Sequence, residues 1–228
     1  MQRSDGDMQR AASRKWTDAA DTSGMFNLTK SIALLGVLAA AFFSPAQNGP
    51  AKGYQPQFTS DGQMKLPEDY RTWIYLSTGF DMSYTANPMA MGHHMFDNVF
   101  VNPEAYAEFM KTGTWPDGTT FMLEGRMAVG KGSINQSGNY QSDSVMGREA
   151  HVKDSKRFKG GWGFFPFDDD KTAKMIPETA GCYSCHQQHG AVDTTFVQFY
   201  PTLLPMAKSK GTLSPAYKEE SSREDKKE

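Results

Sequence analysis

Stretches in which hydrophobic and polar residues alternate occupy most of the middle of the chain. A period of two is typical of strands that bury one face, and Gly, Pro, Asp and Asn separate the stretches as turn residues do. The pattern predicts strands at residues 72–77, 95–101, 119–129, 144–152 and 161–167.

Helical patterns are fewer and shorter. Asn102 can cap a helix that has Pro103 at its first position and stops at Gly113. Further short helices are expected at residues 171–175 and after Asp193. Strands with helices inserted or appended, rather than alternating strictly with them, predict an α+β fold with a mainly antiparallel sheet.

The N-terminal segment, residues 1–46, differs from the rest. Residues 32–43 (IALLGVLAAAFF) form an unbroken apolar run, preceded by Lys30 and followed by the small residues Ser44 and Ala46. This pattern is typical of a cleaved signal peptide. The run is shorter than the roughly 20 apolar residues of a membrane-spanning helix, so a retained anchor is the weaker alternative. We therefore expect export to the periplasm, with cleavage near Ala46.

The remaining chain divides into a spacer, one folding unit and a tail. Residues 47–53 are rich in Gly, Pro and Gln, as flexible spacers are. Residues 54–207 hold all the predicted strands and helices. Residues 208–228 are charged with few apolar groups, so we expect a disordered tail there.

Composition narrows the range of partners. The chain has 24 Lys and Arg against 26 Asp and Glu, a net charge of -2, and so offers no basic surplus to a polyanion. Nucleic acid is therefore not an expected partner. Aromatic residues make up 12% of the chain, which suits an apolar pocket, although an aromatic core is the plainer interpretation.

The chain's two cysteines stand in the sequence Cys182-Tyr183-Ser184-Cys185-His186, a C-x-x-C-H motif. Two thiols three residues apart on a helical turn can add to the two vinyl groups at one edge of a porphyrin, and the adjacent His then reaches the iron. The motif predicts one covalently attached haem c per chain, held by Cys182 and Cys185, with His186 as the iron ligand.

Three other uses of the cysteines are weaker. A thioredoxin-like redox pair needs a βαβ context that the pattern lacks. A zinc site recruiting His186 or His189 would crowd its ligands into eight residues, without a second Cys pair. A structural disulfide across so short a loop would remove little entropy from the unfolded chain.

Three segments together resemble the cytochrome P-460 family. They are NPEAYAEFMKTGTWPDGTTFMLE at residues 102–124, GREAHVKDSKRFKGGWGFFPF at 147–167 and ETAGCYSCHQQHGAVDTTFVQFYPTL at 178–203. The resemblance implies a mainly antiparallel β fold, a haem-bearing segment late in the chain and a homodimer.

One position separates the functional branches of that family. Members that oxidise hydroxylamine carry a Lys bonded to the haem edge, just before a Glu in the strand after a WPDGT-like turn. Here Leu123 precedes Glu124, and the nearest lysines, Lys111 and Lys131, lie outside this part of the strand. The chain is therefore more similar to the cytochrome c-prime-beta branch, whose haem is not cross-linked and whose distal side is capped by aromatic rings.

The strand itself favours an apolar haem pocket. Alternation puts Phe121, Leu123 and Met127 on one face and Glu124 and Arg126 on the other. Such a face offers no donor for dioxygen and no strong base, whereas nitric oxide and carbon monoxide bind iron without either.

The preceding predicted strand carries two more aromatic residues that we expect to complete the cap, Phe96 and Phe100. For all five of these residues the alternative is an ordinary place in the core.

The sequence contains several candidates for a sixth ligand of the iron. The chain has 14 methionines, which are more often core residues than ligands. His93 and His94 are expected in a solvent-facing loop and His151 on a strand facing water, although each is an available ligand. Arg148 and Glu149 could serve haem propionates or a proton path, or simply pair at the surface.

Together these features predict an exported mono-haem c-type cytochrome, five-coordinate, that binds nitric oxide or a related diatomic ligand for sensing, scavenging or buffering. One alternative is an enzyme, an oxidoreductase of the cytochrome P-460 type that converts hydroxylamine or nitric oxide. The other is a periplasmic electron carrier with a redox partner protein.

Overall fold

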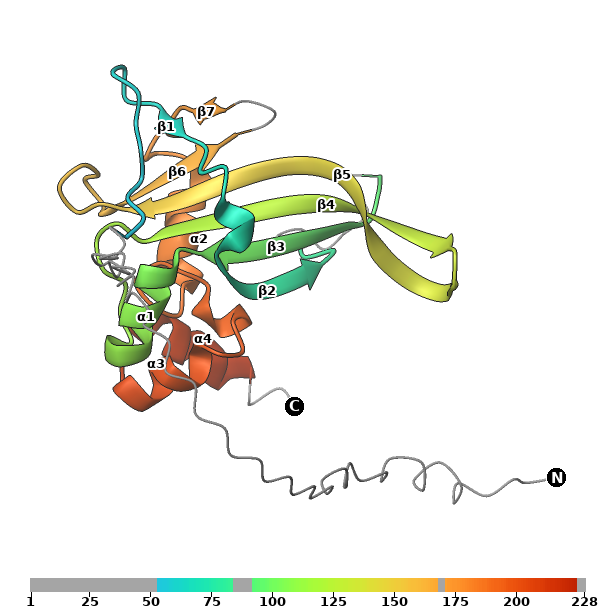
Figure 1. Ribbon diagram of the computed structural model, residues 1–228. Coiled ribbons are helices and arrows are strands. Elements are labelled where there is room, and N and C mark those ends of the chain that lie inside the picture. The colour runs from blue at the N-terminus through green and yellow to red at the C-terminus, as the bar shows by residue number, and fades with distance from the viewer. Residues whose placement is uncertain (1–52, 84–91, 168–170, 225–228) are drawn as a thin grey trace, which may run out of the picture. The chain divides into compact units, whose positions relative to one another are not determined.

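The computed structural model describes residues 53–83, 92–167 and 171–224 (Figure 1). The expected signal peptide and most of the expected spacer lie outside these residues. Within them, no helix is both long enough and apolar enough to cross a membrane.

The predicted α+β fold is confirmed, with one large antiparallel sheet at its centre. Its strands lie in sequence order, β2-β3-β4-β5-β6, so each pairs with its neighbours along the chain. All the strands predicted from alternation are present. Their bounds are Ile74–Phe80 for β2, Met95–Val101 for β3, Thr120–Gly132 for β4, Asn135–Lys153 for β5 and Trp162–Pro166 for β6.

Strands β4 and β5 run well beyond the others as a two-stranded hairpin (Figure 1). Their register is irregular there, with shifts between Gly125 and Arg126, and again before Ala128 and before Gly132. Each shift of this kind changes which side chains face which side of the sheet.

A second, small sheet pairs β1 (Met64–Lys65) with β7 (Thr172–Ala173). The helix expected at residues 171–175 is therefore wrong. Ala173 lies opposite Met64 and is buried, so pairing with a distant strand determines the conformation of a segment too short to hold a helix alone.

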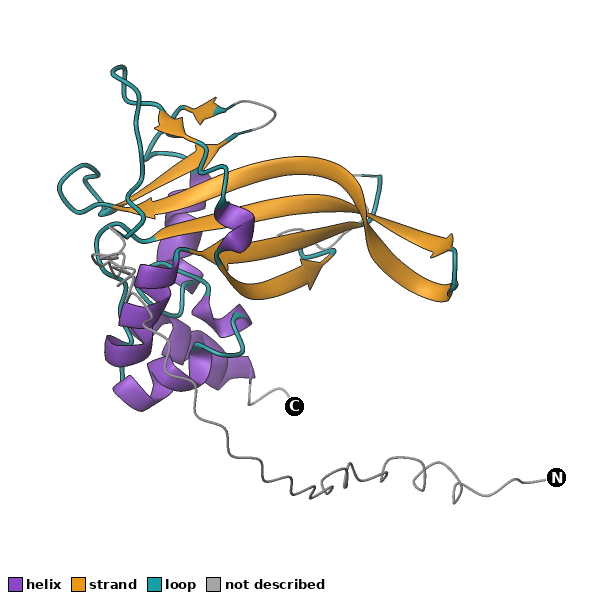
Figure 2. Cartoon of the chain, viewed as in Figure 1, coloured by secondary structure: helices purple, strands orange, loops and turns teal. Residues whose placement is uncertain are grey.

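The helices gather on one side of the large sheet, at the end away from the hairpin (Figure 2). They are α1 (Pro103–Thr112), α2 (Gly181–His189), α3 (Leu204–Lys210) and α4 (Pro215–Glu224), with the 3-10 turn η3 (Val197–Phe199). A further 3-10 turn, η1 (Tyr70–Thr72), lies on the other face, where Tyr70 is buried. Helix α1 follows the prediction and ends at Gly113, whose φ of 75° is left-handed. Asn102 precedes α1, but its side chain instead accepts a hydrogen bond from the Thr120 N–H at 2.8 Å.

Two expectations for the C-terminal part are wrong. Asp193 does not cap a helix, because its own φ is 47°; the next element along the chain is the short 3-10 turn η3. Residues 208–228 were expected to be disordered, yet α3 extends to Lys210 and α4 follows it. Leu213, just before α4, and Tyr217, on α4, pack against the core, so tertiary contacts rather than local pattern hold this polar helix.

The buried side chains form two clusters, one on each face of the sheet. One cluster includes Phe109, Trp115 and Phe121 with residues of the C-terminal helices. The other includes Tyr70, Met122 and Phe165. The functional motif lies on the helical side.

Candidate haem site

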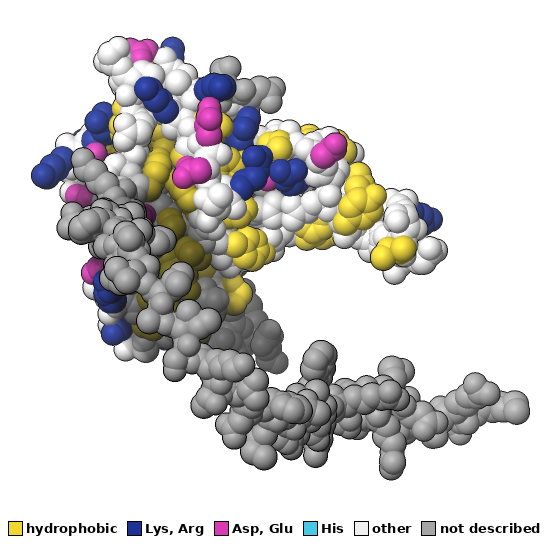
Figure 3. Space-filling view, viewed as in Figure 1, with side chains coloured by type: hydrophobic (Ala, Val, Ile, Leu, Met, Phe, Trp, Pro, Cys, Tyr) yellow, Lys and Arg dark blue, Asp and Glu magenta, His cyan; other side chains and the backbone are white. Residues whose placement is uncertain are grey.

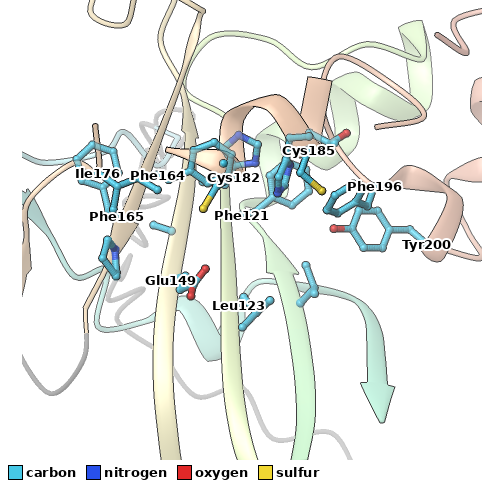
Figure 4. Close-up of a pocket in the computed structure, with 17 residues that line it drawn as sticks. Phe121, Leu123, Glu149, Phe164, Phe165, Ile176, Cys182, Cys185, Phe196 and Tyr200 are labelled. Carbon is cyan, nitrogen blue, oxygen red and sulfur yellow. The ribbon is translucent and has the colours of Figure 1, made fainter. Parts of the chain in front are cut away.

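The C-x-x-C-H motif lies on α2, as its spacing predicts. Cys182 is exposed, Cys185 is partly buried, and both thiols are free. Figure 4 shows the two sulfur atoms beside one cavity, with Phe121 and Phe164 near them. A helix that carries both thiols and the adjacent imidazole has the arrangement that porphyrin attachment requires.

The cavity has a volume of about 550 Å³, within the range of small-molecule sites. Strands β3 to β6, helix α2 and the segment after it all contribute to its wall. The lining residues are Val99, Phe121, Leu123, Glu149, Ala150, His151, Phe164, Phe165, Pro166, Ile176, Gly181, Cys182, Cys185, His186, Thr195, Phe196 and Tyr200. Most are aliphatic or aromatic, which suits a flat apolar macrocycle.

His186 is fixed in orientation by a backbone hydrogen bond. Its Nδ1 lies 2.8 Å from the carbonyl oxygen of Thr194, which can only accept, so Nδ1 carries the hydrogen. Burial lowers the pKa of His186 and favours the neutral imidazole. The tautomer leaves Nε2 as the nitrogen suited to bind a metal ion.

Aromatic rings surround the imidazole of His186. The ring centroid of Phe196 lies 4.2 Å from it, that of Phe164 4.7 Å and that of His151 5.0 Å. These contacts hold the ring plane in place, while the carbonyl of Thr194 sets its rotation.

His151 does not face water as expected. It lies opposite Phe121 on β4 and Phe164 on β6, on the sheet face that α2 covers, and its Nε2 is buried without a hydrogen-bond partner. Burial is the main cause that lowers the pKa of His151 well below its ordinary value, and the charge of the neighbouring His186 is the second cause. The charged neighbours of His151 along β5 predicted an exposed face. That prediction is wrong because α2, which is remote in sequence, covers this face.

His151 and His186 are also not placed to bind one metal ion from opposite sides. Two nitrogen ligands on opposite sides of one metal ion are about 4 Å apart at the nitrogens alone, and their ring centres lie farther out. The rings of His151 and His186 are 5.0 Å apart at an interplanar angle of 78°, in direct edge contact. A porphyrin plane does not fit between them.

Part of the expected aromatic cap is wrong. Phe96 lies opposite Arg126, on the other face from Leu123, and packs against Phe80 with ring centroids 4.9 Å apart. Phe100 likewise faces away and contacts Tyr70.

Val99 lines the cavity in place of the two rings, because it pairs directly with Leu123. Met127 does not line the cavity: its register with β3 keeps it on the same face as Leu123, but it lies four residues further along β4, beyond the lining residues. Phe121 and Leu123 do line it, as expected. A strand's alternation identifies two faces but does not show which one meets the helices.

The structure also adds an acid to the wall. Glu149 lies directly opposite Leu123 and lines the cavity, as Figure 4 shows. Asp97 lies on the same face, two residues before Val99 on β3. Burial, together with the carboxylates of Glu149 and Asp81, raises the pKa of Asp97 to about 6. Arg148 lies on the opposite face, where its register partner is Glu124.

The remaining histidines lie away from the cavity. His94 is exposed, as expected; its Nδ1 is 2.5 Å from Asp81, and its ring stacks on Phe80. His93 is partly buried, so the expectation of a solvent-facing residue is wrong for it. In the described part of the chain, no group of three His, Cys, Asp or Glu side chains could hold a metal ion.

These features define a class of protein. An apolar cavity with two thiols and a neutral, oriented imidazole at its rim suits a haem, so the fold and site are those of a haem-binding cytochrome. The chain belongs to the cytochrome P460 family, whose sequence model matches residues 67–197. No curated protein matches the chain.

Proposed function

We propose that this protein is an exported c-type cytochrome with one haem c, attached through Cys182 and Cys185 and ligated by His186. The observation that carries the proposal is that Cys182, Cys185 and His186 all lie on α2 and all line the apolar cavity. Each S–H would add across one vinyl group, so attachment needs no leaving group.

The proposed ligand is nitric oxide or a related diatomic molecule, bound at a five-coordinate iron. Among the cavity-lining residues there is no methionine or lysine, and His151 contacts His186 rather than facing it across a plane. Val99, Phe121 and Leu123 provide an apolar wall. Nitric oxide and carbon monoxide bind iron without a hydrogen-bond donor, so such a wall favours them for sensing, scavenging or buffering.

Glu149 gives specific support to the alternative, an oxidoreductase acting on hydroxylamine or nitric oxide. Oxidation of hydroxylamine releases protons as well as electrons, and a carboxylate in the cavity can accept them. The face of β4 that carries Leu123 has no base, and the sequence left open whether Glu149 serves a proton path or pairs at the surface. The neighbouring strand provides one.

A visible spectrum of the purified, reduced protein separates these functions. We expect a five-coordinate, high-spin ferrous haem that takes up one nitric oxide per chain. A red-shifted Soret band would indicate a further cross-link and favour the enzyme, whereas a six-coordinate low-spin spectrum would favour an electron carrier with a protein partner.

Export and dimerisation complete the proposal. Large hydrophobic side chains are exposed on β2 and β5, and Figure 3 shows hydrophobic surface on the sheet and on its hairpin. Patches of this kind often mark protein interfaces, and a homodimer would cover them. The exposed residues on these strands are Tyr75, Phe80, Tyr140 and Met146. Light scattering would test the dimer, and mass spectrometry of the native protein should show a chain that begins near Gln47.

A further inference from the structure

The backbone just after α2 contains a strained turn. Asp193 and Thr194 have φ values of 47° and 60°, and they lie between the antiparallel partners Val192 and Thr195. Two successive residues with positive φ between paired residues form a type I′ turn, for which Asn-Gly is the usual sequence. A β-branched residue in this conformation costs on the order of 1–3 kcal/mol, so other contacts must hold it.

Side chains from the end of the sheet hold this turn. Lys153, on β5, forms an ion pair with Asp193, and its Nζ donates to the carbonyl of Trp115 at 2.8 Å. The indole N–H of Trp162, on β6, donates to Asp193 at 3.3 Å. The indole N–H of Trp115 donates to the hydroxyl of Thr195 at 2.9 Å. The side chain of Lys153 is only 20% exposed, so its ion pair is partly shielded from water.

The turn positions the carbonyl of Thr194, which accepts the Nδ1 hydrogen of His186. The close approach depends on Gly190, at the end of α2. A Cβ at this position would lie 2.8 Å from Cα of Thr194 and 2.6 Å from the carbonyl oxygen of His186, too close for either.

We propose that Lys153 is a positioning residue for His186: through Asp193 it holds the strained turn whose Thr194 carbonyl accepts the Nδ1 hydrogen, and so sets the strength of the iron–histidine bond. The partner that hydrogen-bonds the second nitrogen of a ligating His raises its basicity, and losing such a partner typically costs about 10–100-fold in metal affinity. A more basic His favours ferric over ferrous iron and lowers the reduction potential. The inference rests on the proposed function, because His186 must be the iron ligand.

Lys153→Met in the purified haem protein tests the proposal. We expect a lower iron–histidine stretching frequency in the resonance Raman spectrum of the ferrous protein. We also expect a higher midpoint potential: a tenfold loss in the preference of His186 for ferric iron corresponds to about 59 mV for one electron.

Lys153→Arg keeps the charge and should stay near the wild-type values. The matched control is Lys171→Met, because Lys171 pairs with Glu68 at the exposed surface. This variant should change neither the stretching frequency nor the midpoint potential.

An unchanged frequency and potential in Lys153→Met, with haem attached, would overturn the proposal and leave the proposed function intact. If Lys153→Met does not fold, Asp193→Ala and Trp162→Phe decide, because Asp193→Ala removes the side chain that Lys153 and Trp162 contact and Trp162→Phe removes one donor to it. Both variants should lower the iron–histidine stretching frequency and raise the midpoint potential. Wild-type values of both quantities in both variants would refute the proposed role of Lys153. A wild-type protein without attached haem would overturn the proposed function together with this inference.

Discussion

Leu123 and Glu149 are direct cross-strand partners on β4 and β5, and both side chains line the cavity. Paired residues of an antiparallel sheet have Cβ atoms about 4.5–5.5 Å apart, so an aliphatic group and a carboxylate lie next to each other in the wall. A ligand near this wall meets mostly apolar surface and one acid, and that acid distinguishes the two candidate functions.

Glu149→Gln measures the contribution of the acid. If the protein only binds its ligand, the wild type should oxidise hydroxylamine no faster than a generic haem, and the variant should keep its affinity for nitric oxide. Glu178→Gln, at an exposed residue shortly before the motif, is the control. Steady hydroxylamine turnover by the wild type that Glu149→Gln abolishes would instead make the enzyme the first candidate.

The attachment residues have separable effects. Cys182→Ala combined with Cys185→Ala should abolish covalent haem, and a haem stain that survives denaturing electrophoresis would contradict this. His186→Ala should retain the stain, because both thioethers remain, but lose the normal coordination spectrum. A variant spectrum identical to that of the wild type would show that another residue is the ligand.

Phe121→Ala should speed carbon monoxide binding to the ferrous protein, because the ring is part of the cavity wall. The ring is also buried, so the free energy of unfolding should fall by about 3–5 kcal/mol, and Phe121→Leu is the milder variant. Phe109→Leu, in the same core cluster but away from the cavity, should destabilise the fold without changing the kinetics. Flash photolysis provides the rates, and equal rates in all four proteins would argue against a ring that limits ligand entry.

Asp97 predicts a pH dependence of stability with a definite sign. Its pKa is raised from 3.8 to about 6 in the folded protein, so between these values the folded state binds more protons than the unfolded state. Stability due to this group is therefore present below pH 3.8 and falls as pH rises to about 6. Asp97→Asn should be more stable than the wild type at pH 7, with the advantage shrinking toward pH 4.

Thermal unfolding at several pH values measures this difference. Asp117→Asn is the control of opposite sign, because hydrogen bonds from Ser155 lower the pKa of Asp117. Its removal should destabilise the protein at pH 7. A pH profile of Asp97→Asn parallel to that of the wild type would contradict the assignment.

The C-terminal helix should contribute to stability. A chain that ends at Gly211 loses the contacts of Leu213 and Tyr217 and the hydrogen bond from the Ser214 N–H to Ala191, at 2.7 Å. Partial burial of two such side chains suggests a loss of about 2–3 kcal/mol in denaturant unfolding. Removal of residues 225–228 alone serves as the control, and equal stability of the two shortened chains would show that α4 is dispensable.

The sequence by itself determined the local features. Alternation located every strand of the large sheet, Asn102, Pro103 and Gly113 marked α1, and the cysteine spacing placed the motif on a helix. These features are readable because each depends on residues within a few positions of one another, through backbone geometry and periodicity.

Only the tertiary structure decided which face of each strand meets α2. It brings His151 and Glu149 to the cavity, turns Phe96 away, and selects Val99 in its place. The C-terminal helix and the turn at Asp193 and Thr194 also depend on tertiary contacts. Tyr217 packs against the core and Lys153 pairs with Asp193, and these partners are remote in sequence. Register and helix packing are contacts between distant segments, and no local pattern along the chain encodes which face those segments will share.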